Sequence, residues 1–376
     1  MWIDNDKDFS DWCREAMRHD AVALDTEFVW TKTFYPALGL LQMAWDREHT
    51  ALVDVLAVSD TSAFADLLQA PEVTKIFHEA ASDLPILHRW CGGDILPRNV
   101  FDTRIAAGFV GLTASLSLNK LLTQVLGITL AKTETRTDWL QRPLTQAQLE
   151  YASGDVDYMP ELHAALLERL HQNGNEAWFR EEMLPCTTEE YYVPTAPEDC
   201  WKRIGGAGRY NGKQLAVIVE LAAWRESFAM KNNIARPWII SDAQICACAE
   251  TSPKNAADLI STVGLRRKNA ERYAVYIINA VARGLATPPE RFHTHPVLPM
   301  DSKIFKERVE RVKGLIVKRS EARGIDSVLV ASRKEMDSLV IAAAKKPWPF
   351  SHPLLMGWRR ELLGDTIEKL VQSNFA

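Results

Sequence analysis

The sequence predicts a layered α/β domain in its first half and an all-helical second half. Short apolar runs of strand length alternate with stretches of helical periodicity through the first 192 residues, and this alternation is typical of helices packed on a sheet. Pro185, Pro194 and Pro197 then mark a linker, after which no convincing strand run follows. The 376 residues are enough for two or three domains, with a sizeable core in the first.

Each expected strand is an apolar run that ends at polar or turn-forming residues. We expect strands over residues 21–30, 38–45, 50–55 and 73–77. Helical periodicity separates or follows these runs. We expect helices to begin at Thr61, Asp83, Asp102, Ser117 and Thr145.

The second half is expected to form separate helical domains. A first helical region runs from about Cys200 to Leu285, and the segments TPPE and HTHPVLP form a second linker after it. The residues beyond that linker are again helical by pattern. We therefore predict domains over residues 1–192, 200–287 and 296–376.

The net charge of −5 conceals a sharp division between the halves. Residues 1–200 contain 15 Lys and Arg against 32 Asp and Glu (−17), whereas residues 201–376 contain 29 against 17 (+12). Because an acidic half repels a polyanion, a basic second half that captures nucleic acid explains this division. The alternative is that the basic residues only keep small helical domains in solution, which accounts less well for a difference of 29 charges.

Two acids stand at the end of the first apolar run, in AVALDTEFVW. Because side chains alternate along a strand, Asp25 and Glu27 project to the same face. Such a pair repels unless a cation or solvent compensates it. The alternative is that the strand has already ended and both acids are solvated, so the pair alone is weak evidence for a metal site.

The segment LTQAQLEYASGDVDYMPELHAALLERL predicts a helix in which Tyr151 and Asp155 lie one turn apart on a common face. A carboxylate with a phenol above it can ligate a metal ion and orient a water molecule. The alternative is an ordinary helix with Tyr151 at the rim and Asp155 solvated. Gly154 lowers helix stability by about 1 kcal/mol relative to Ala, which indicates a close approach to a neighbouring segment.

The segment VTKIFHEAASDLPILHRW places Asp83 in the first turn of a helix that follows a strand. An acid at that position often serves only to cap the helix or to offset its dipole. His78, at the end of the strand, is expected to be a hydrogen-bonded structural histidine rather than a metal ligand.

Taken together, DTEF, HEAASDL and TETRTDWLQRPLT leading into YASGD resemble the tyrosine-bearing branch of the DEDD exonuclease superfamily, and most specifically the ribonuclease D family. The resemblance covers residues 1–192 and continues into helices that resemble the HRDC module, with a weaker signature in the last segment. It implies a ribonuclease-H-like α/β exonuclease domain, with a mixed sheet flanked by helices, followed by one or two small all-α HRDC-like domains.

Carried over position by position, the resemblance implies catalytic roles for Asp25, Glu27, Asp83, Tyr151 and Asp155. The four acids hold two divalent cations, Mg²⁺ or Mn²⁺, about 3.5–4 Å apart. Asp25 bridges both ions, Glu27 and Asp155 complete the first site, and Asp83 supports the second. Tyr151 positions or deprotonates the attacking water, and the terminal nucleotide leaves as a 5′-monophosphate. An all-oxygen ligand set favours these ions over zinc.

Four further residues are expected to bind substrate: Thr26, Phe28, Arg136 and Arg142. The sequence leaves open whether either arginine forms a structural ion pair instead. The implied substrate is RNA with a free 3′ end, in particular tRNA precursors and other small structured RNAs. An exonuclease acting on DNA remains an alternative, as does a nucleic-acid-binding protein without activity, although the intact catalytic set disfavours the latter.

The middle helical region resembles the HRDC outline in WRESFAMKNNIARPWIISDAQICACAETSPKNAADL. Ser241 and Asp242 are expected helix N-cap residues. A basic cluster around the following turns can bind phosphates or form an ordinary solvated face. Its members are Lys254, Arg266, Arg267 and Lys268.

The remaining sequence signals concern location and redox state. Charged residues at positions 4–8 interrupt any apolar signal segment, and the uncharged stretch 105–118 is too short to span a bilayer. The six cysteines lack paired zinc spacing, and Cys246 and Cys248 are expected to be buried free thiols. We therefore expect a cytoplasmic monomer without membrane contact.

Overall fold

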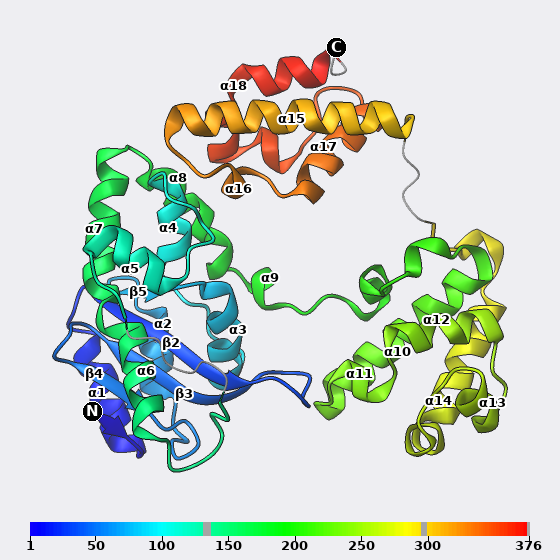
Figure 1. The fold of residues 1–376 in the computed structure, drawn as a ribbon, viewed down its shortest axis with the longest axis horizontal. Coiled ribbons are helices and arrows are strands. Elements are labelled where there is room, and N and C mark those ends of the chain that lie inside the picture. The colour runs from blue at the N-terminus through cyan, green and yellow to red at the C-terminus, as the bar shows by residue number, and fades with distance from the viewer. Residues whose placement is uncertain (131–136, 295–298, 374–376) are drawn as a thin grey trace. The chain divides into compact units, whose positions relative to one another are not determined.

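The computed structural model describes residues 1–130, 137–294 and 299–373, which form two compact units. The sheet unit comprises Met1–Phe28, Leu38–Tyr192 and the described part of the C-terminal segment. The helical unit comprises Val29–Ala37 and the described residues of 193–297. Figure 1 shows the elements of each unit.

The sheet unit is built on a six-stranded sheet in the order β1-β4-β3-β2-β5-β6. The strands are β1 (Trp2–Ile3), β2 (Ala21–Val29), β3 (Ala37–Ala44), β4 (Thr50–Val53), β5 (Thr74–Phe77) and β6 (Val100–Asp102). β5 pairs in parallel with β2 and β6, and β3 pairs antiparallel with β4, so the sheet is mixed as predicted. The short strands β1 and β6 lie outside the prediction because two or three residues carry no measurable periodicity.

Helices cover the sheet and fill most of the remaining sheet unit (Figure 1). Up to residue 192 they are α1 (Asp6–Ala16), α2 (Ser62–Gln69), α3 (Ala80–Trp90), α4 (Thr103–Phe109), α5 (Leu118–Leu126), α6 (Gln146–Asp157), α7 (Met159–Gln172), α8 (Glu176–Met183) and α9 (Glu189–Tyr192). The continuous helix expected after Thr145 is wrong, since the structure breaks it at Tyr158. Pro160, in the first turn of α7, has no N–H to continue the hydrogen-bond ladder of α6.

The C-terminal helices also belong to the sheet unit. They are α15 (Ser302–Arg323), α16 (Ser327–Val330), α17 (Arg333–Lys345) and α18 (Gly357–Gln372). The Arg359 guanidinium donates to both carboxylate oxygens of Glu182, at 2.8 and 3.0 Å. The Trp358 ring packs edge-on against Phe109, with ring centroids 5.0 Å apart. These contacts join α18 to α8 and α4, so the C-terminal helices share a hydrophobic core with the sheet.

The helical unit has its own core, around α10. Its α-helices are α10 (Gly212–Asn232), α11 (Arg236–Ile239), α12 (Asp242–Thr251), α13 (Ala256–Ser261) and α14 (Arg267–Ala286). Ser241 is the N-cap of α12 and forms a capping box with Gln244, as predicted, whereas Asp242 is the first helical residue and pairs with Arg225. Cys246 and Cys248 are buried free thiols, which confirms that prediction.

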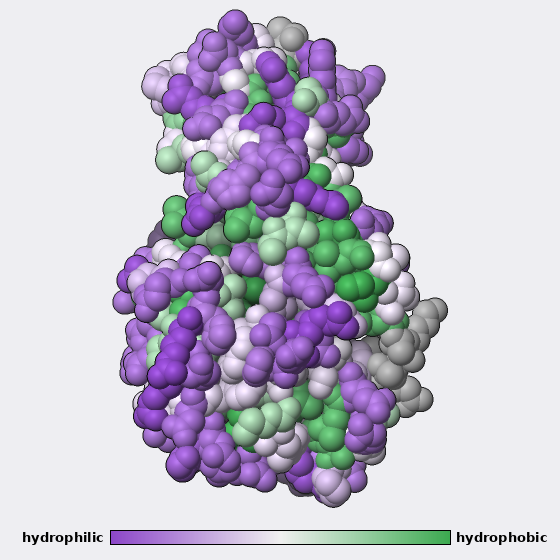
Figure 2. Space-filling model, turned by 90° about the vertical axis from the view of Figure 1, so that its left-hand side faces the viewer, coloured by the Kyte–Doolittle hydropathy of each residue, from purple (hydrophilic) through white to green (hydrophobic). Residues whose placement is uncertain are grey.

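Short 3₁₀ helices connect these elements. They are η1 (Leu184–Thr187), η2 (Pro197–Arg203), η3 (Ala207–Arg209), η4 (Pro289–Arg291) and η5 (Pro353–Leu355). Figure 2 shows one face of the molecule, on which hydrophilic residues predominate and apolar residues gather in smaller areas. In the described ranges, none of the helices has the length and apolar character needed to cross a membrane.

Candidate active site

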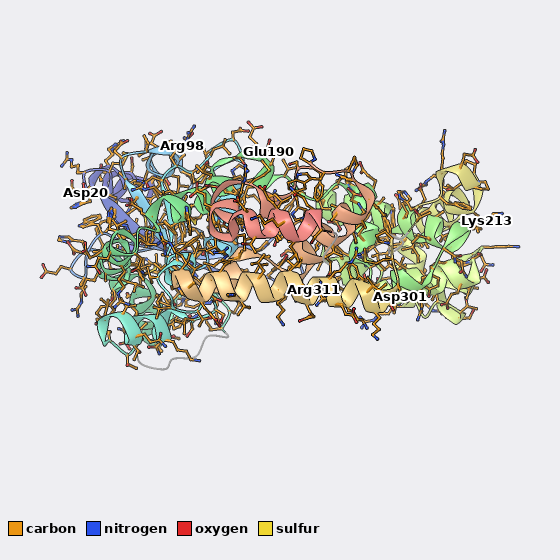
Figure 3. All side chains as sticks on the ribbon, turned by 90° about the horizontal axis from the view of Figure 1, so that it is seen from above. Asp20, Arg98, Glu190, Lys213, Asp301 and Arg311 are labelled. Atoms are coloured by element: carbon orange, nitrogen blue, oxygen red, sulfur yellow. The ribbon has the colours of Figure 1, made fainter. Side chains whose placement is uncertain are left out.

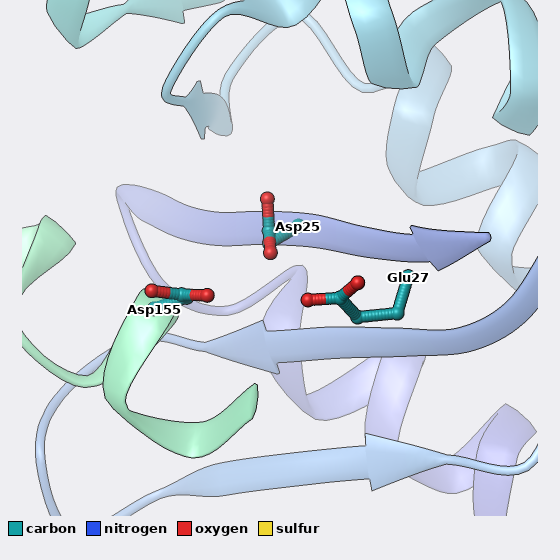
Figure 4. A group of neighbouring side chains, drawn as sticks. All are labelled: Asp25, Glu27 and Asp155. Carbon is teal, nitrogen blue, oxygen red and sulfur yellow. The ribbon is translucent and has the colours of Figure 1, made fainter. Parts of the chain in front are cut away.

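Strand β2 carries the first two acids of the site. Val22, Ala23 and Leu24 are fully buried and fix the strand in the centre of the sheet. Asp25 and Glu27 follow on one face of the strand, as the alternation of side chains predicts. Figure 4 shows both carboxyl groups turned toward the same space.

Helix α6 brings the third acid to that space. A capping box between Thr145 and Gln148 starts the helix, and Ala152 and Val156 anchor its inner face in the core. Asp155 is thereby turned toward β2 (Figure 4). One carboxylate oxygen each from Asp25, Glu27 and Asp155 lies within 4.8 Å of the others, so the three acids meet.

Tyr151 lies one helical turn before Asp155, on the same side of α6. Both side chains line the same pocket, and the Asp155 carboxylate acts electrostatically on the Tyr151 phenol. The Tyr151 ring also lies 6.2 Å from the buried Trp139 ring, which holds it against the protein. Burial and the neighbouring acids raise the pKa of the Tyr151 phenol above its ordinary value, so the phenol keeps its proton at neutral pH.

Asp83 joins the site from α3 and is not a helix cap. Its side chain is buried, and one carboxylate oxygen accepts a hydrogen bond of 2.5 Å from the Thr26 hydroxyl. That bond ties α3 to β2, so it fixes Asp83 relative to the acids of the strand. The Thr26 hydroxyl is therefore used within the protein, although Thr26 and Phe28 both line the pocket.

The acids of the site carry strongly perturbed pKa values. Desolvation, followed by repulsion from Asp155 and Asp83, raises the pKa of Glu27 to about 8. Desolvation and the neighbouring acids also raise the pKa of Asp25, and burial raises the pKa values of Asp83 and Asp155. In the described part of the chain, no Lys or Arg contributes to these shifts for the three converging acids. A bound cation would offset this repulsion.

The donor set fits a divalent cation that prefers oxygen. Carboxylate oxygens of Asp25, Glu27 and Asp155 converge, and no Cys or His joins them among the described residues. An all-oxygen donor set of this kind is typical of sites for hard divalent cations.

Asp102, which the sequence predicts only as the start of a helix, supports the segments that surround the acids. Its carboxylate accepts hydrogen bonds from the backbone N–H groups of Ala80, at the start of α3, and Arg104, in α4. One buried acid therefore fixes the N-termini of both helices. His78 lies 2.9 Å from the Thr103 hydroxyl, which confirms the expected structural histidine.

The acids open into a pocket of about 1000 Å³. Its walls come from the ends of β2 and β5, from the first turns of α3, α4 and α5, and from α6. A pocket of this size can hold more than a single nucleotide-sized ligand. Gly154 lines it, and a Cβ placed there would meet no atom within 4 Å, so the expected close approach of a neighbour at Gly154 is wrong.

The two predicted substrate-binding arginines have different outcomes. Arg136 lies outside the described residues. The Arg142 guanidinium makes five hydrogen bonds, to both carboxylate oxygens of Asp54 and to the backbone carbonyls of Gly39, Trp139 and Gln141. Because Arg has five N–H donors, none is left for a phosphate. The structural ion pair is therefore the alternative that the contacts of Arg142 support.

Three family matches cover most of the chain. Residues 1–171 match the 3′-5′ exonuclease family, residues 214–281 match the HRDC domain, and residues 304–367 match the ribonuclease D C-terminal HRDC domain. The fold and the acid cluster thus define a 3′-5′ exonuclease of a class that uses divalent metal ions, followed by HRDC domains.

Relatives extend this likeness over the full length. Ribonuclease D of Desulfotalea psychrophila is 34% identical, with 96% of each chain covered, and that of Escherichia coli is 32% identical, with 98% of each covered. The crystal structure of the E. coli enzyme, described as an exoribonuclease involved in structured RNA processing, matches with a TM-score of 0.89 over 99% of this chain and 98% of that chain. The chain belongs to the ribonuclease D family and is a 3′-5′ exoribonuclease.

Proposed function

We propose that the protein removes nucleotides from the 3′ ends of structured RNAs, such as tRNA precursors, by two-metal-ion hydrolysis at the acid cluster. The observation that carries this proposal is the convergence of three half-buried carboxylates, without a basic partner among the described residues, at the floor of a large pocket. Each cycle releases one nucleoside 5′-monophosphate.

Four acids have the role of holding metal in this proposal. Asp25, Glu27 and Asp155, whose oxygens converge, would hold one cation, and Asp83 would help to hold a second together with Asp25. The bound Mg²⁺ or Mn²⁺ ions would acidify the attacking water and stabilise charge on the leaving oxygen. In this proposal the carboxylates are ligands and not nucleophiles. Desolvation and mutual repulsion raise their pKa values, and a bound cation would offset both.

Tyr151 has the role of orienting the attacking water. Its place one helical turn before Asp155 in α6 and its neighbour, the Trp139 ring, hold the phenol beside the acids. Because the pKa of the phenol is raised, the protonated phenol acts as a hydrogen-bond partner of the water rather than as a preformed base.

RNA is the proposed substrate, and the same chemistry could serve DNA. The E. coli relative is described as acting on structured RNA, whereas the acid cluster by itself does not distinguish the two sugars. The expected cytoplasmic location and monomeric state belong to this proposal, as do the boundaries of the three domains.

A direct assay compares 5′-labelled RNA and DNA single strands of one sequence, each with Mg²⁺ and with EDTA. We expect metal-dependent, stepwise shortening of the RNA from its 3′ end, release of 5′-monophosphates, and slower attack on DNA. Faster hydrolysis of DNA would favour the DNA alternative. Shortening that persists in EDTA would contradict the metal mechanism.

A further inference from the structure

The pocket has an unusual balance of charge for a site that receives a polyanion. Seven acidic residues line it: Asp25, Glu27, Glu79, Asp83, Glu150, Asp155 and Asp157. Among the described lining residues, Arg104 is the only Lys or Arg. Burial lowers the pKa of His78, the one lining histidine, so that side chain is neutral at physiological pH. Arg104 is thus the permanent positive charge of the described pocket wall.

Arg104 is held in place on two sides. It lies in the first turn of α4, where its backbone N–H bonds to Asp102, and its Nε donates to the carbonyl of Ala114 at 2.5 Å. Its Nη1 lies 2.6 Å from a carboxylate oxygen of Glu79. Its Nη2 donates to no residue in the described ranges. The Arg104 side chain is 30% exposed and lines the pocket.

Glu79 meets this guanidinium with a carboxylate that is 52% exposed. The residue has a φ of 74°, in the left-handed region that a glutamate seldom adopts, and Asp102 accepts a hydrogen bond from its backbone N–H. An exposed carboxylate on an anchored guanidinium occupies the place that a phosphate oxygen can take, because Arg binds both anions through the same donors.

The position of Arg104 relative to the acids indicates which phosphate it meets. Glu79 is the N-cap of α3 and Asp83 lies in the first turn of that helix, so Glu79 and its partner Arg104 lie on the Asp83 side of the cluster. In the proposed function, on which this step rests, Asp83 supports the site beside the leaving 3′ oxygen. That oxygen belongs to the nucleotide that stays with the RNA body, so the retained strand extends toward Arg104.

We infer that Arg104 is a substrate-positioning residue that binds a phosphate of the retained strand, immediately upstream of the bond that is cleaved. The contact places the 3′ end over the acids and offsets part of the repulsion between RNA and the pocket. Glu79 is displaced from the guanidinium when the phosphate arrives.

The test compares two substrates that differ in this phosphate. One is a short single-stranded RNA. The other is a nucleoside 5′-p-nitrophenyl phosphate, in which a phenol replaces the retained strand and no upstream phosphate exists. For Arg104→Gln on RNA we expect KM to rise roughly tenfold, as for loss of a charge-assisted hydrogen bond, with kcat little changed. On the nitrophenyl ester we expect KM and kcat close to those of the unmodified protein.

Binding measured with Ca²⁺ in place of Mg²⁺ gives a second readout, independent of turnover. Arg104→Gln should reduce the salt dependence of RNA binding by about 0.7 log units per tenfold change in salt, the value for one phosphate bound on a single strand. Arg104→Lys should restore much of the slope. Arg98→Gln is the matched control, since Arg98 (labelled in Figure 3) is exposed and is not among the described pocket-lining residues, and its loss changes net charge equally.

A neutral methylphosphonate at single linkages of the RNA locates the contact. On the unmodified protein, the linkage just upstream of the scissile bond should weaken binding most, and the same change should have little further effect on Arg104→Gln. If Arg104→Gln fails to fold, the loss of binding at each modified linkage still tests the inference on the unmodified protein. An equal loss at every linkage would overturn the inference. Equal losses on RNA and on the ester would also overturn it. An unmodified protein that cleaves neither substrate with Mg²⁺ would instead contradict the proposed function.

Discussion

Charged side chains that are partly or fully removed from solvent have opposite surroundings in the active-site pocket and in the helical unit. In the helical unit, Glu226 is 4% exposed and receives two hydrogen bonds from Arg236, and the buried Arg225 pairs with Asp242. In the pocket, Asp25, Glu27 and Asp155 face one another, and no basic side chain among the described residues neutralises them. A buried charge with an internal partner supports the fold. A group of like charges without one indicates a ligand that is still to bind.

The largest effect that tests this contrast is loss of turnover in the pocket. Asp25→Asn or Asp155→Asn should abolish hydrolysis of RNA, because each removes a metal ligand, while the fold is retained. In EDTA, the melting temperature of either variant should equal or exceed that of the unmodified protein, since a repulsive acid has gone. Circular dichroism and a nuclease assay on the same samples check both outcomes. Retained activity in either variant would contradict the two-metal assignment.

Tyr151→Phe should have the next largest effect on rate. Removing the phenol should lower kcat by about 10²-fold or more, the range for a group that assists proton transfer. Metal affinity, measured by Mn²⁺ titration, should change little because the ligand set is intact. A variant that loses Mn²⁺ binding and regains full kcat at high Mn²⁺ would assign Tyr151 to metal binding instead.

In the helical unit, removing one charge of a buried pair should lower the stability of the protein. Arg236→Met leaves Glu226 buried without its partner and should lower the free energy of unfolding by about 3 kcal/mol. The matched double variant, Arg236→Met with Glu226→Gln, removes the stranded charge and should recover part of the loss. Chemical denaturation measures both. A single variant that is as stable as the unmodified protein would show that the pair adds nothing to the fold.

The pH dependence of stability should also reveal the raised pKa values of the unpaired acids. The pKa of Glu27 is about 8 in the fold against an ordinary 4.5, so between these values the folded state keeps a proton that the unfolded chain has lost. Its stabilising contribution is full below pH 4.5 and is lost as pH rises toward 8. Without metal, stability should therefore fall from pH 5 to 7, by at most about 1.4 kcal/mol per pH unit for each such group.

Melting curves in EDTA and in Mg²⁺ at each pH provide the measurement. The stabilisation by Mg²⁺ should grow with pH, because metal competes with protons for the same carboxylates. Glu27→Gln should flatten the dependence. Buried Lys75, whose pKa falls to about 7, works in the opposite direction above pH 7. His163, whose pKa falls to about 4, does so within the window, so the difference between Glu27→Gln and the unmodified protein isolates the acid. A metal effect that is independent of pH would contradict the site.

The smallest expected effect concerns exposed charges of the helical unit. Arg266, Arg267 and Lys268 lie at the N-terminal end of α14 and are exposed. Cations there oppose the helix dipole, so they do not serve stability. Replacing all three by Gln should leave the melting temperature equal or slightly higher, and should reduce the salt dependence of RNA binding by about 0.7 log units for each phosphate that these residues bind. If the salt dependence of RNA binding is unchanged, these residues do not bind phosphate and serve solubility instead.

The parts of the fold and site that follow local rules could be predicted from the sequence. The alternation of side chains placed Asp25 and Glu27 on one face of β2, and helical spacing placed Tyr151 near Asp155. The central strands followed from their apolar runs. The structural role of His78 followed from the rule that a lone histidine at a strand end forms a hydrogen bond.

Contacts between residues far apart in the sequence could not be predicted. Asp54 and Arg142 are 88 positions apart, and no local pattern links them. The same holds for the bond between Thr26 and Asp83, and for the attachment of α18 to α8 through Arg359. Arg104 was missed because nothing in the sequence relates it to the acids. Asp102, the N-cap of α4, was expected to start a helix, but the bond that its carboxylate accepts from Ala80 in α3 is a long-range contact.

The attachment of the C-terminal helices also affects how the protein can be divided in experiments. Removing all residues after about position 195 would expose Phe109 and leave Glu182 without Arg359. A truncated protein would therefore change the stability of the sheet unit together with its net charge. Substitutions such as those in α14 separate the two effects, and truncation does not.

The empty space beside Gly154 links the stability of α6 to the width of the pocket. An alanine there would meet no atom within 4 Å and should stabilise α6 by up to about 1 kcal/mol, so the packing offers no reason for a glycine. Its methyl group would instead narrow the pocket next to Asp155. Gly154→Ala should therefore raise the melting temperature of the enzyme and restrict the 3′ ends that it accepts.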